Sequence, residues 1–547
     1  MAEAKKVYIR NKGNGVTYIY LDEPYWDSDK KVGRHKRKGI GKIDENGNEV
    51  YNEYYRSLMS SAAEEPISIS KSVKLGEKLI CRKIAKETGL SSTLRKAFGN
   101  DQAEMIEALA GYLMCESRPL AYAEPWLDER DWKSGMTSQA ISELLGSVGE
   151  DRMNGFFSLW LKRCMGRKSI LFDITSISSY GRDNGYVERG YNRDRENLEQ
   201  INLALLSTYD TRTPLMMKHL SGSLSDVAVM RQMIETLAKM GVDSFSIMAD
   251  RGFCSDENLD FMHSRKIGFT IPVPSSVGWQ KQLIRENIGK LYRPDALISA
   301  PDGSEGIIYA KTVYDASSPY GRVWKHLYYD PMRKERETAA LMARLSRCMD
   351  DLRRGETREA DSYLYEAYFH VKETPKRGRQ VRLDDEAVQA FIDGESCYWV
   401  ILSSVEKDAS ACLRQYRERN NIELHFDDLK NATDCRRLRT HNERTMVGRL
   451  FVSFISLILI SRLRSAVSEI PAKERRHWNW KEILSHSASY GKCIFSGRYK
   501  DVYTAPNKGQ RMIFNALGIS YYWKGKLIDK AEGKDICDDD ETEEVCS

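Results

Sequence analysis

Short apolar runs bounded by turns dominate residues 166–274, and they predict strands and helices in the order β-β-β-α-β-α-β. The strands are expected at 169–176, 198–209, 213–220, 245–249 and 268–273, and the helices at 225–240 and 256–265. Alternation of strands with helices over this distance is typical of an α/β domain. We therefore expect an α/β core in this part of the chain.

Two aspartates interrupt this apolar pattern. Asp173 lies within the first predicted strand, and Asp250 ends the fourth, where Arg251 and Gly252 turn the chain. An aspartate in an apolar strand is costly unless it is paired or binds a metal. One such residue would be interpreted as a structural cap of a turn. Two of them, on strands that this order makes neighbours in one sheet, favour a shared site.

The segment 416–430 (YRERNNIELHFDDLK) contains no proline or glycine and predicts a single α-helix. At about 100° of rotation per residue, four side chains fall on one narrow stripe: Tyr416, Arg419, Glu423 and Lys430. A solvated face with charge pairs has this pattern, and so does a face that binds a phosphate beside a metal-ligating carboxylate. The helix alone does not decide between them.

The rest of the chain divides by composition and periodicity. A basic loop follows the first strand-like runs, helices follow it, and aromatic-rich strands separate the α/β core from the helix at 416–430. The expected domains are 1–60 (β-rich and basic), 61–165 (helical and DNA-binding, with a candidate helix-turn-helix), 166–274 (core, first part), 275–410 (β-rich insertion), 411–465 (core, second part, with the glutamate helix), 466–530 (helical) and 531–547 (an acidic tail, expected to be disordered).

Composition narrows the class of protein. With 547 residues, of which 41% are hydrophobic and 30% charged, the chain is long enough for several globular domains. The net charge is +5, and the seven acids of 535–544 leave about +12 on the chain before them, which suits a polyanionic partner. Eleven cysteines without a C-x-x-C pair argue against a zinc site or disulfides and for a reducing compartment. No secretory signal is visible, and the apolar run 450–460 is too short to cross a bilayer, so we expect a buried helix and no membrane partner.

The spacing Tyr416-x2-Arg419-x3-Glu423-x6-Lys430 matches the Tyr-Arg-Glu-Lys signature of prokaryotic insertion-sequence transposases of the DDE class. It occurs together with Asp173 in its strand, with the MADRGF stretch, and with a β-rich insertion before the glutamate helix. In this combination the chain resembles the insertion sequence 4-like group over roughly 165–465. The stretches YWVILSS and GRLFVSFISLILISRL are similar to its 1634-like subgroup.

This resemblance implies a ribonuclease-H-like catalytic domain with a β-rich insertion. It also implies a transposase that binds the ends of its mobile element and catalyses metal-dependent cleavage and transfer of DNA strands in cut-and-paste transposition, through a hairpin intermediate. The implied catalytic and metal-binding residues are Asp173, Asp250 and Glu423, and the implied DNA-binding residues are Tyr416, Arg419 and Lys430. The expected cofactor is Mg²⁺, as two ions that Mn²⁺ can replace. The expected partners are double-stranded DNA of the element ends and the target, with a homodimer in the active complex, in the prokaryotic cytoplasm near the nucleoid.

The chemistry of these residues agrees with that function. Paired divalent ions in phosphodiester cleavage are hard cations, and three carboxylates provide the oxygen ligands that they prefer. Two alternatives stay open: a ribonuclease-H-fold DNA nuclease that does not join strands, and a non-catalytic, transposase-derived DNA-binding protein, against which the intact acidic triad argues. Loop polarity explains some nearby residues as well as function does, namely Asp194, Arg195, Gln200 and Asp226, and packing is the simpler role for Trp279, Trp324 and Trp399.

Overall fold

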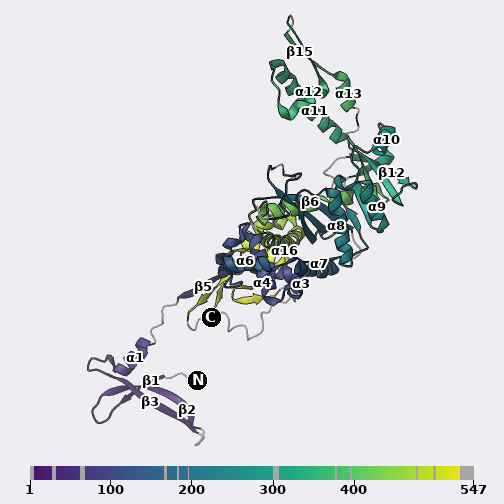
Figure 1. Ribbon diagram of the computed structural model, residues 1–547. Coiled ribbons are helices and arrows are strands. Elements are labelled where there is room, and N and C mark those ends of the chain that lie inside the picture. Colours follow the sequence, from purple (N-terminus) through teal and green to yellow (C-terminus); the bar gives the residue numbers. More distant parts are fainter. Residues whose placement is uncertain are drawn as a thin grey trace. The chain divides into compact units, whose positions relative to one another are not determined.

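The protein is described here by a computed structural model in which contacts divide the chain into two compact units (Figure 1). The first unit comprises mainly Met1–Ser72 and Cys493–Val502, and the second Val73–Lys492 and Tyr503–Cys546. The structure describes residues 5–27, 32–61, 68–165, 169–181, 184–194, 196–299, 307–375, 378–392, 394, 397–440, 442–475, 478–496 and 500–529. The predicted acidic tail at 531–547 lies outside the described residues.

The first unit is β-rich, as the sequence predicts for 1–60. Its antiparallel sheet has the order β1-β2-β3-β4 and is followed by one helix. The elements are β1 (Lys5–Arg10), β2 (Thr17–Asp27), β3 (Val32–Ile43), β4 (Glu49–Tyr51) and α1 (Glu53–Ser61). Ile19, Ile40 and Tyr55 form its small hydrophobic core. A further strand, β5 (Ile69–Lys74), pairs in a three-stranded sheet of order β19-β18-β5 with β18 (Gly491–Phe495) and β19 (Val502–Tyr503).

Helices fill residues 76–164, in agreement with the prediction of a helical region. They are α2 (Gly76–Thr88), α3 (Leu90–Phe98), α4 (Asn100–Glu116), α5 (Ala123–Glu129), α6 (Ser138–Ser147) and α7 (Glu150–Cys164). Gly89 has a φ of 75° and its N–H donates to the carbonyl of Lys86, which ends α2. Glycine adopts this left-handed conformation without the steric cost that a side chain would add, which suits it to the end of the helix.

A large mixed sheet forms the core of the second unit, in the order β11-β12-β13-β16-β10-β9-β6-β7-β8. Its predicted strands are β6 (Ser169–Ser179), β7 (Gln200–Thr208), β8 (Pro214–Ser221), β9 (Ser246–Met248) and β10 (Gly268–Pro272), with helices α8 (Asp226–Lys239) and α9 (Asp256–Ser264) between them. β6, β7 and β8 pair antiparallel, whereas β9 runs parallel to both β6 and β10. The predicted order of elements is confirmed, and the fold is of the mixed α/β type.

The insertion differs from the expected separate lobe at 275–410, because its strands continue the same sheet beyond β10. β16 (Tyr398–Ser403) pairs with β10, and the remaining elements of this part are α10 (Gly278–Asn287), β11 (Leu297–Ser299), β12 (Ile307–Asp315) and β13 (Val323–Tyr329). No described strand lies between β6 and β9, which pair directly. β10 would otherwise present unpaired backbone groups at an open edge, and β16 satisfies them.

The middle of the insertion has a hydrophobic cluster of its own, distinct from the one formed where β12, β13 and β16 meet α14. Its elements are α11 (Pro331–Arg354), α12 (Ser362–Tyr368), β14 (Phe369–Thr374), β15 (Gly378–Leu383) and α13 (Asp385–Ile392), most of which are labelled in Figure 1. The expectation that the aromatic-rich segments of this part form strands is wrong for 362–368, which is helical, and Leu364, Tyr365 and Tyr368 all pack in this cluster. That spacing shares one face only in a helix. The chain leaves β13 and returns in β16 at partner residues, Tyr329 and Tyr398.

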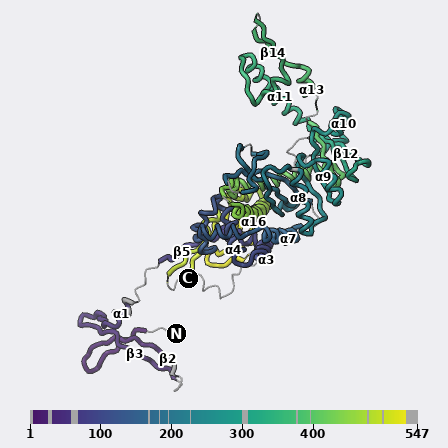
Figure 2. Tube along the Cα trace, viewed as in Figure 1, coloured from purple at the N-terminus to yellow at the C-terminus, as the bar shows by residue number. Residues whose placement is uncertain are grey.

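A long helix, α16 (Glu443–Glu469), packs against α4, α6 and β8 inside the second unit (Figure 2). By length and composition it could cross a membrane, but 94% of its most apolar window is buried within the protein. The predicted buried helix is thereby confirmed. A Cβ atom at Gly448 would lie 2.1 Å from the carbonyl oxygen of Leu145, so glycine is what permits the close crossing with α6.

The C-terminal part holds helices and also short strands, whereas only helices were predicted for 466–530. It comprises α17 (Ala472–Arg475), α18 (Trp480–Ser487), α19 (Lys508–Ala516), β20 (Tyr521–Trp523) and β21 (Lys526–Ile528), together with β18 and β19. Asn479 and Asn507 begin α18 and α19 as capping boxes, each with a partner side chain three residues on.

Candidate active site

The helix predicted over 416–430 is divided into three segments. α14 (Ala409–Arg417) is followed by a tightened turn, in which the N–H of Arg419 donates to the carbonyl of Tyr416 at 3.0 Å, and then by α15 (Asn420–Asp427). A π-helical turn spans Asp428–Ala432 and is closed by the N–H of Thr433, which donates to the carbonyl of Asp428 at 3.0 Å. Arg464 of α16 anchors this turn through an ion pair with Asp428 at 2.7 Å. Departures of both kinds within a helix often mark functional sites.

The two predicted aspartates lie side by side at neighbouring strands. β6 pairs parallel with β9 so that Leu171 is opposite Met248, and Asp173 and Asp250 each follow two residues later. The N–H of Ile174 donates to Asp173 Oδ1 at 2.8 Å, and the N–H of Arg251 donates to Asp250 Oδ1 at 2.8 Å. Burial raises the pKa of Asp173 to about 6, against the opposing effect of the Arg419 guanidinium, and the carboxyl group of Asp250 adds to the rise.

Arg419 joins the glutamate helix to the first aspartate. Its Nη1 lies 3.1 Å from Asp173 Oδ2 and its Nη2 lies 2.9 Å from Glu423 Oε1. The side chains of Arg419 and Asp173 are only 11% and 16% exposed, whereas that of Glu423 is 56% exposed. The contact with Asp173 is therefore shielded from water, and the contact with Glu423 opens to solvent.

Tyr416, in α14, connects the second aspartate to the helical segment that precedes α15. The Tyr416 hydroxyl lies 3.4 Å from Asp250 Oδ1, and burial raises the pKa of Tyr416 to about 12. At neutral pH this hydroxyl thus keeps its proton and is a donor toward the carboxylate. The Arg419 guanidinium lies 5.7 Å from the centre of the Tyr416 ring. Five of the six residues expected at the site are thereby brought together, from β6, the end of β9 and the α14–α15 segment.

Lys430 is the sixth residue, and its ion pair is with Asp194 rather than with any of these five. The expectation that it would be an unpaired cation on the same stripe is wrong, because its Nζ forms an ion pair with Asp194 at 2.7 Å. The stripe was drawn for a regular helix, and the π-helical turn that contains Lys430 changes the rotation per residue. Asp194, one of the lesser candidates, thus gains a defined contact.

Among the other candidates, the structure gives a packing role wherever it describes the side chain. Gln200 is buried and its Nε2 donates to the carbonyl of Tyr191 at 2.9 Å. Arg195 and the side chain of Asp226 lie outside the described residues. Trp279, Trp324 and Trp399 contact Lys325, Tyr314 and Tyr328 respectively.

Arg193 was not anticipated from the sequence. It lies close enough to Asp173 that its charge lowers the pKa of that carboxyl group, although burial dominates the shift, and its Nη1 donates to Ser176 at 3.3 Å. It belongs to a loop, where no helical or strand periodicity assigns a direction to a side chain. Its place beside Asp194 in the sequence was the only available signal.

The three carboxylates of the site provide the oxygen ligands that a hard divalent cation prefers, but they do not converge on a common point. Within the described part of the chain, no group of three or more histidine, cysteine, aspartate or glutamate side chains is assembled as a metal site. The three carboxyl groups are not gathered close together as expected, because the Arg419 guanidinium lies between those of Asp173 and Glu423. The donors are nevertheless all carboxylate oxygens, and the buried one, Asp173, has the counter-charge that an ionised carboxylate requires there.

A family model described as "Transposase DDE domain" matches residues 166–459, more than half of the chain. The chain belongs to this transposase family. Its function is that of a transposase, and as an enzyme it is a DNA transposase. Curated proteins give no match. Among solved structures, the transposase is similar to one titled "Cryo-EM structure of piggyBac transposase synaptic complex with hairpin DNA (SNHP)", with 12% identity over 76% of each chain and a TM-score of 0.33.

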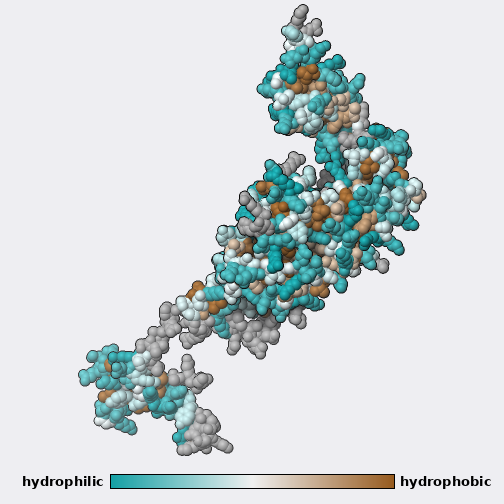
Figure 3. Space-filling view, in the orientation of Figure 1, coloured by the Kyte–Doolittle hydropathy of each residue, from teal (hydrophilic) through white to brown (hydrophobic). Residues whose placement is uncertain are grey.

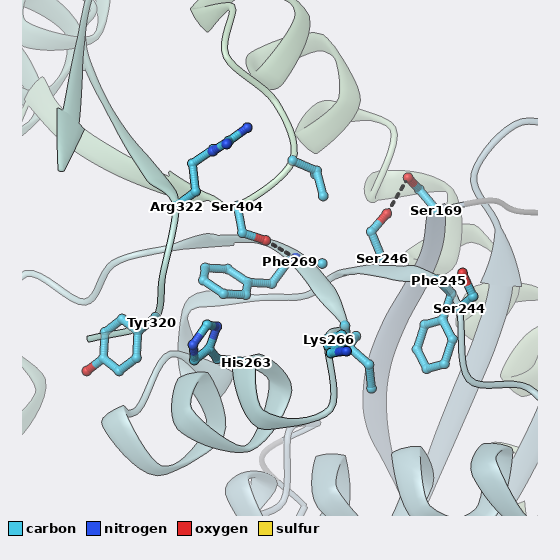
Figure 4. A pocket seen from close by; sticks show the side chains of 13 residues that line it. Ser169, Ser244, Phe245, Ser246, His263, Lys266, Phe269, Tyr320, Arg322 and Ser404 are labelled. Carbon is cyan, nitrogen blue, oxygen red and sulfur yellow. Dashed lines mark hydrogen bonds between the residues drawn. The ribbon is translucent and has the colours of Figure 1, made fainter. Parts of the chain in front are cut away.

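The transposase also has a cavity of about 490 Å³ at the other ends of the same strands (Figure 4). Ser169, Ser246 and Gly268, which begin β6, β9 and β10, line it, and Ser169 hydrogen-bonds Ser246 at 2.7 Å. In Figure 4, His263, Tyr320 and Arg322 lie on the opposite side from these serines. The cavity contains none of the expected site residues and is separate from the candidate active site.

Proposed function

We propose that Asp173, Asp250 and Glu423 form the catalytic centre at which this transposase cuts and joins DNA strands. The observation that carries the proposal is the convergence of the three carboxylates from separate elements on the Arg419–Tyr416 pair. Residues that must act on one phosphodiester have to approach it from different directions. A charged helix without such a role has no need to place Arg419 and Tyr416 against two strand aspartates.

The proposal includes a ribonuclease-H-like core. The part of the sheet that supports it has the order β8-β7-β6-β9-β10, with an acid on the central strand and another directly after its parallel neighbour. Because β6 and β9 are adjacent and parallel, their acids reach the same edge of the sheet. The glutamate on α15 then approaches from outside the sheet.

Members of this family generally use divalent metal ions. Asp173, Asp250 and Glu423 would hold them, most simply as two Mg²⁺ ions for which Mn²⁺ can substitute. Bound there, such ions activate an attacking oxygen and stabilise the charge on the leaving oxygen. Two of the carboxylate oxygens that would hold the ions, Asp173 Oδ2 and Glu423 Oε1, accept from Arg419, so a cation and the guanidinium would compete for them.

The remaining residues act on the substrate. Arg419, once released from its carboxylates, presents a planar pair of donors that fits a phosphate bidentately. Tyr416 keeps its proton and orients Asp250. Lys430 contacts a flanking phosphate when that phosphate replaces Asp194 as its counter-charge.

The substrate and setting complete the proposal. The chain is an insertion sequence 4-like, 1634-like transposase that binds its element ends and target DNA as a homodimer in the prokaryotic cytoplasm. A strand-transfer assay tests this. Purified protein, Mg²⁺ and linear DNA carrying the sequences that flank its own reading frame should give cleaved ends and joined products. Glu423→Ala should give neither. Cleavage without joining would instead identify a nuclease, and DNA binding without cleavage a non-catalytic protein.

A further inference from the structure

Strands β2 and β3 extend beyond the sheet of the first unit as a two-stranded ribbon. β1 accompanies β2 only over Thr17–Asp22, and β4 accompanies β3 only over Gly41–Ile43. From Glu23, which is opposite Lys36, to Asp27, which is opposite Val32, the two strands pair with each other alone. The described side chains of this ribbon, at 23–25 and 32–36, are exposed, and none of them belongs to the hydrophobic core of the unit. The ribbon is therefore a feature that requires another explanation than packing.

The ribbon is strongly basic along β3. This strand carries five lysines and arginines and no acid in the sequence VGRHKRKGIGKI. Arg34, Lys36 and Lys38 alternate along it and so share one face. All three are exposed, and Lys36 forms no ion pair with any residue that the structure describes. The space-filling view shows mostly hydrophilic residues on the visible face of the first unit, outside its grey atoms (Figure 3).

The two faces of the ribbon differ in how their charge is used. On the other face, Asp22 neutralises Arg37 at 3.0 Å and His35 at 2.7 Å. On the Arg34–Lys36–Lys38 face, Lys38 Nζ lies 3.6 Å from the centre of the Tyr54 ring in α1. This contact holds the side chain at the end of the face that is nearest the sheet. Tyr25, opposite Arg34, is 46% exposed on the same face. The first face thus pairs its basic side chains with Asp22, and the second carries three basic side chains on β3 together with one acid, Glu23, and the ring of Tyr25.

We propose that this ribbon enters the major groove of double-stranded DNA, with the Arg34–Lys36–Lys38 face on the phosphate backbone. The major groove of B-DNA admits a two-stranded β-ribbon, and cations spaced along a strand match a line of phosphates. The sequence predicted a DNA-binding domain in the helices at 61–165 and left open whether the basic segment 30–39 contacts nucleic acid; this inference assigns DNA contact to that segment of the first unit. It rests on the proposed function in taking DNA as the partner, and it does not involve the catalytic residues.

The test measures binding of the full chain to a fluorescein-labelled 40-base-pair duplex of random sequence, by anisotropy, between 50 and 250 mM KCl. Each phosphate contact contributes a slope of about −0.9 in log K against log salt, which is roughly eightfold in affinity at 0.1 M. Lys36→Ala with Lys38→Ala should therefore weaken binding on the order of 50-fold at 0.1 M and reduce the slope by about 1.8. Lys5→Ala with Lys12→Ala removes the same charge from exposed positions of the same unit and should change both values little.

Two further arms make the outcome decisive. Glu23→Gln removes an acid opposite Lys36 and should tighten binding, a gain that no folding defect produces. Methyl green, which occupies the major groove, should compete with the protein, whereas netropsin in the minor groove should not. Equal losses from the two lysine pairs, or competition by netropsin alone, would overturn the inference while leaving the transposase function standing. A wild-type chain that binds no duplex would instead count against the proposed function itself.

Discussion

Replacing Arg419 with glutamine removes the guanidinium that lies between Asp173 and Glu423 and leaves a shorter, uncharged polar side chain in its place. Both of its carboxylate contacts are lost, at 3.1 Å and 2.9 Å. If the guanidinium is the counter-charge of a metal-free site, the variant should be less stable without metal and should gain more than the wild type when metal is added.

The magnitude follows from the different exposure of the two contacts. Hydrogen bonds to charged groups contribute about 1.5–3 kcal/mol, and an exposed ion pair contributes at most about 1 kcal/mol. The buried contact with Asp173 therefore accounts for most of the effect, and we expect a total loss of about 2–3 kcal/mol in the free energy of unfolding. For domains of some 150–250 residues this lowers the melting midpoint by roughly 4–12 °C, and by less in a larger cooperative unit.

The assay is thermal melting of wild type and Arg419→Gln in EDTA and in 10 mM Mg²⁺ or Mn²⁺. A ligand that binds only the folded state stabilises it by an amount that grows with its affinity. Because the guanidinium no longer competes, the metal-induced shift should be larger in the variant. Arg437→Gln is the matched control, since Arg437 pairs with Glu196 at 2.8 Å but is 43% exposed. Equal melting points of Arg419→Gln and wild type in EDTA, with equal metal shifts, would refute the reasoning.

Three further predictions concern the site and the fold. Asp173→Ala, Asp250→Ala and Glu423→Ala should each abolish DNA cleavage but leave DNA binding intact, and a variant retaining a tenth of wild-type cleavage would remove its residue from the site. Lys430→Ala should weaken DNA binding and lower the salt slope by about 0.9, whereas Lys473→Ala, at an exposed position, should not. Burial lowers the pKa of His326, so below about pH 6.5 the unfolded chain takes up a proton on this side chain more readily than the folded chain does. The contribution of His326 to the free energy of unfolding should therefore be fully present above about pH 6.5 and be lost as the pH falls toward the folded-state pKa. Unfolding in urea at pH 7.5 and 5.5 measures this, and an equal loss in His326→Gln would show that another group is responsible.

The core of the fold was predictable because each of its signals is local. The strands around Asp173 and Asp250 are bounded apolar runs, and parallel pairing of their strands then brings the two acids together. The helix over 416–430 was predicted as one piece, since no residue in it breaks a helix. Its tightened turn at Arg419 and its π-helical turn at Lys430 depend on contacts with distant residues, which a local pattern does not contain.

Other features of the structure depend on contacts between residues that are distant in the sequence, and a local sequence pattern does not predict them. The contact of Arg419 with Asp173 and the pairing of Lys430 with Asp194 each join residues more than 200 positions apart. Aromatic residues at 363–368 favour a strand by propensity, yet their packing requires a helix. β16 pairs with the edge of β10 and so belongs to the central sheet, although the length of the insertion alone indicated a separate subdomain.

The partner residues Tyr329 and Tyr398 show that the lobe of α11 to α13 leaves and re-enters the sheet at adjacent positions. In the connectivity of the chain, this whole lobe is the loop of a β-hairpin formed by β13 and β16. A hairpin loop can change length at little entropic expense, since each doubling costs only about 0.6 kcal/mol. This segment could therefore be deleted as a unit. Joining residue 330 to residue 397 by a short turn should leave the glutamate helix, which follows β16, in its place. Such an architecture lets a lineage gain, exchange or shed an accessory module without disturbing the catalytic geometry.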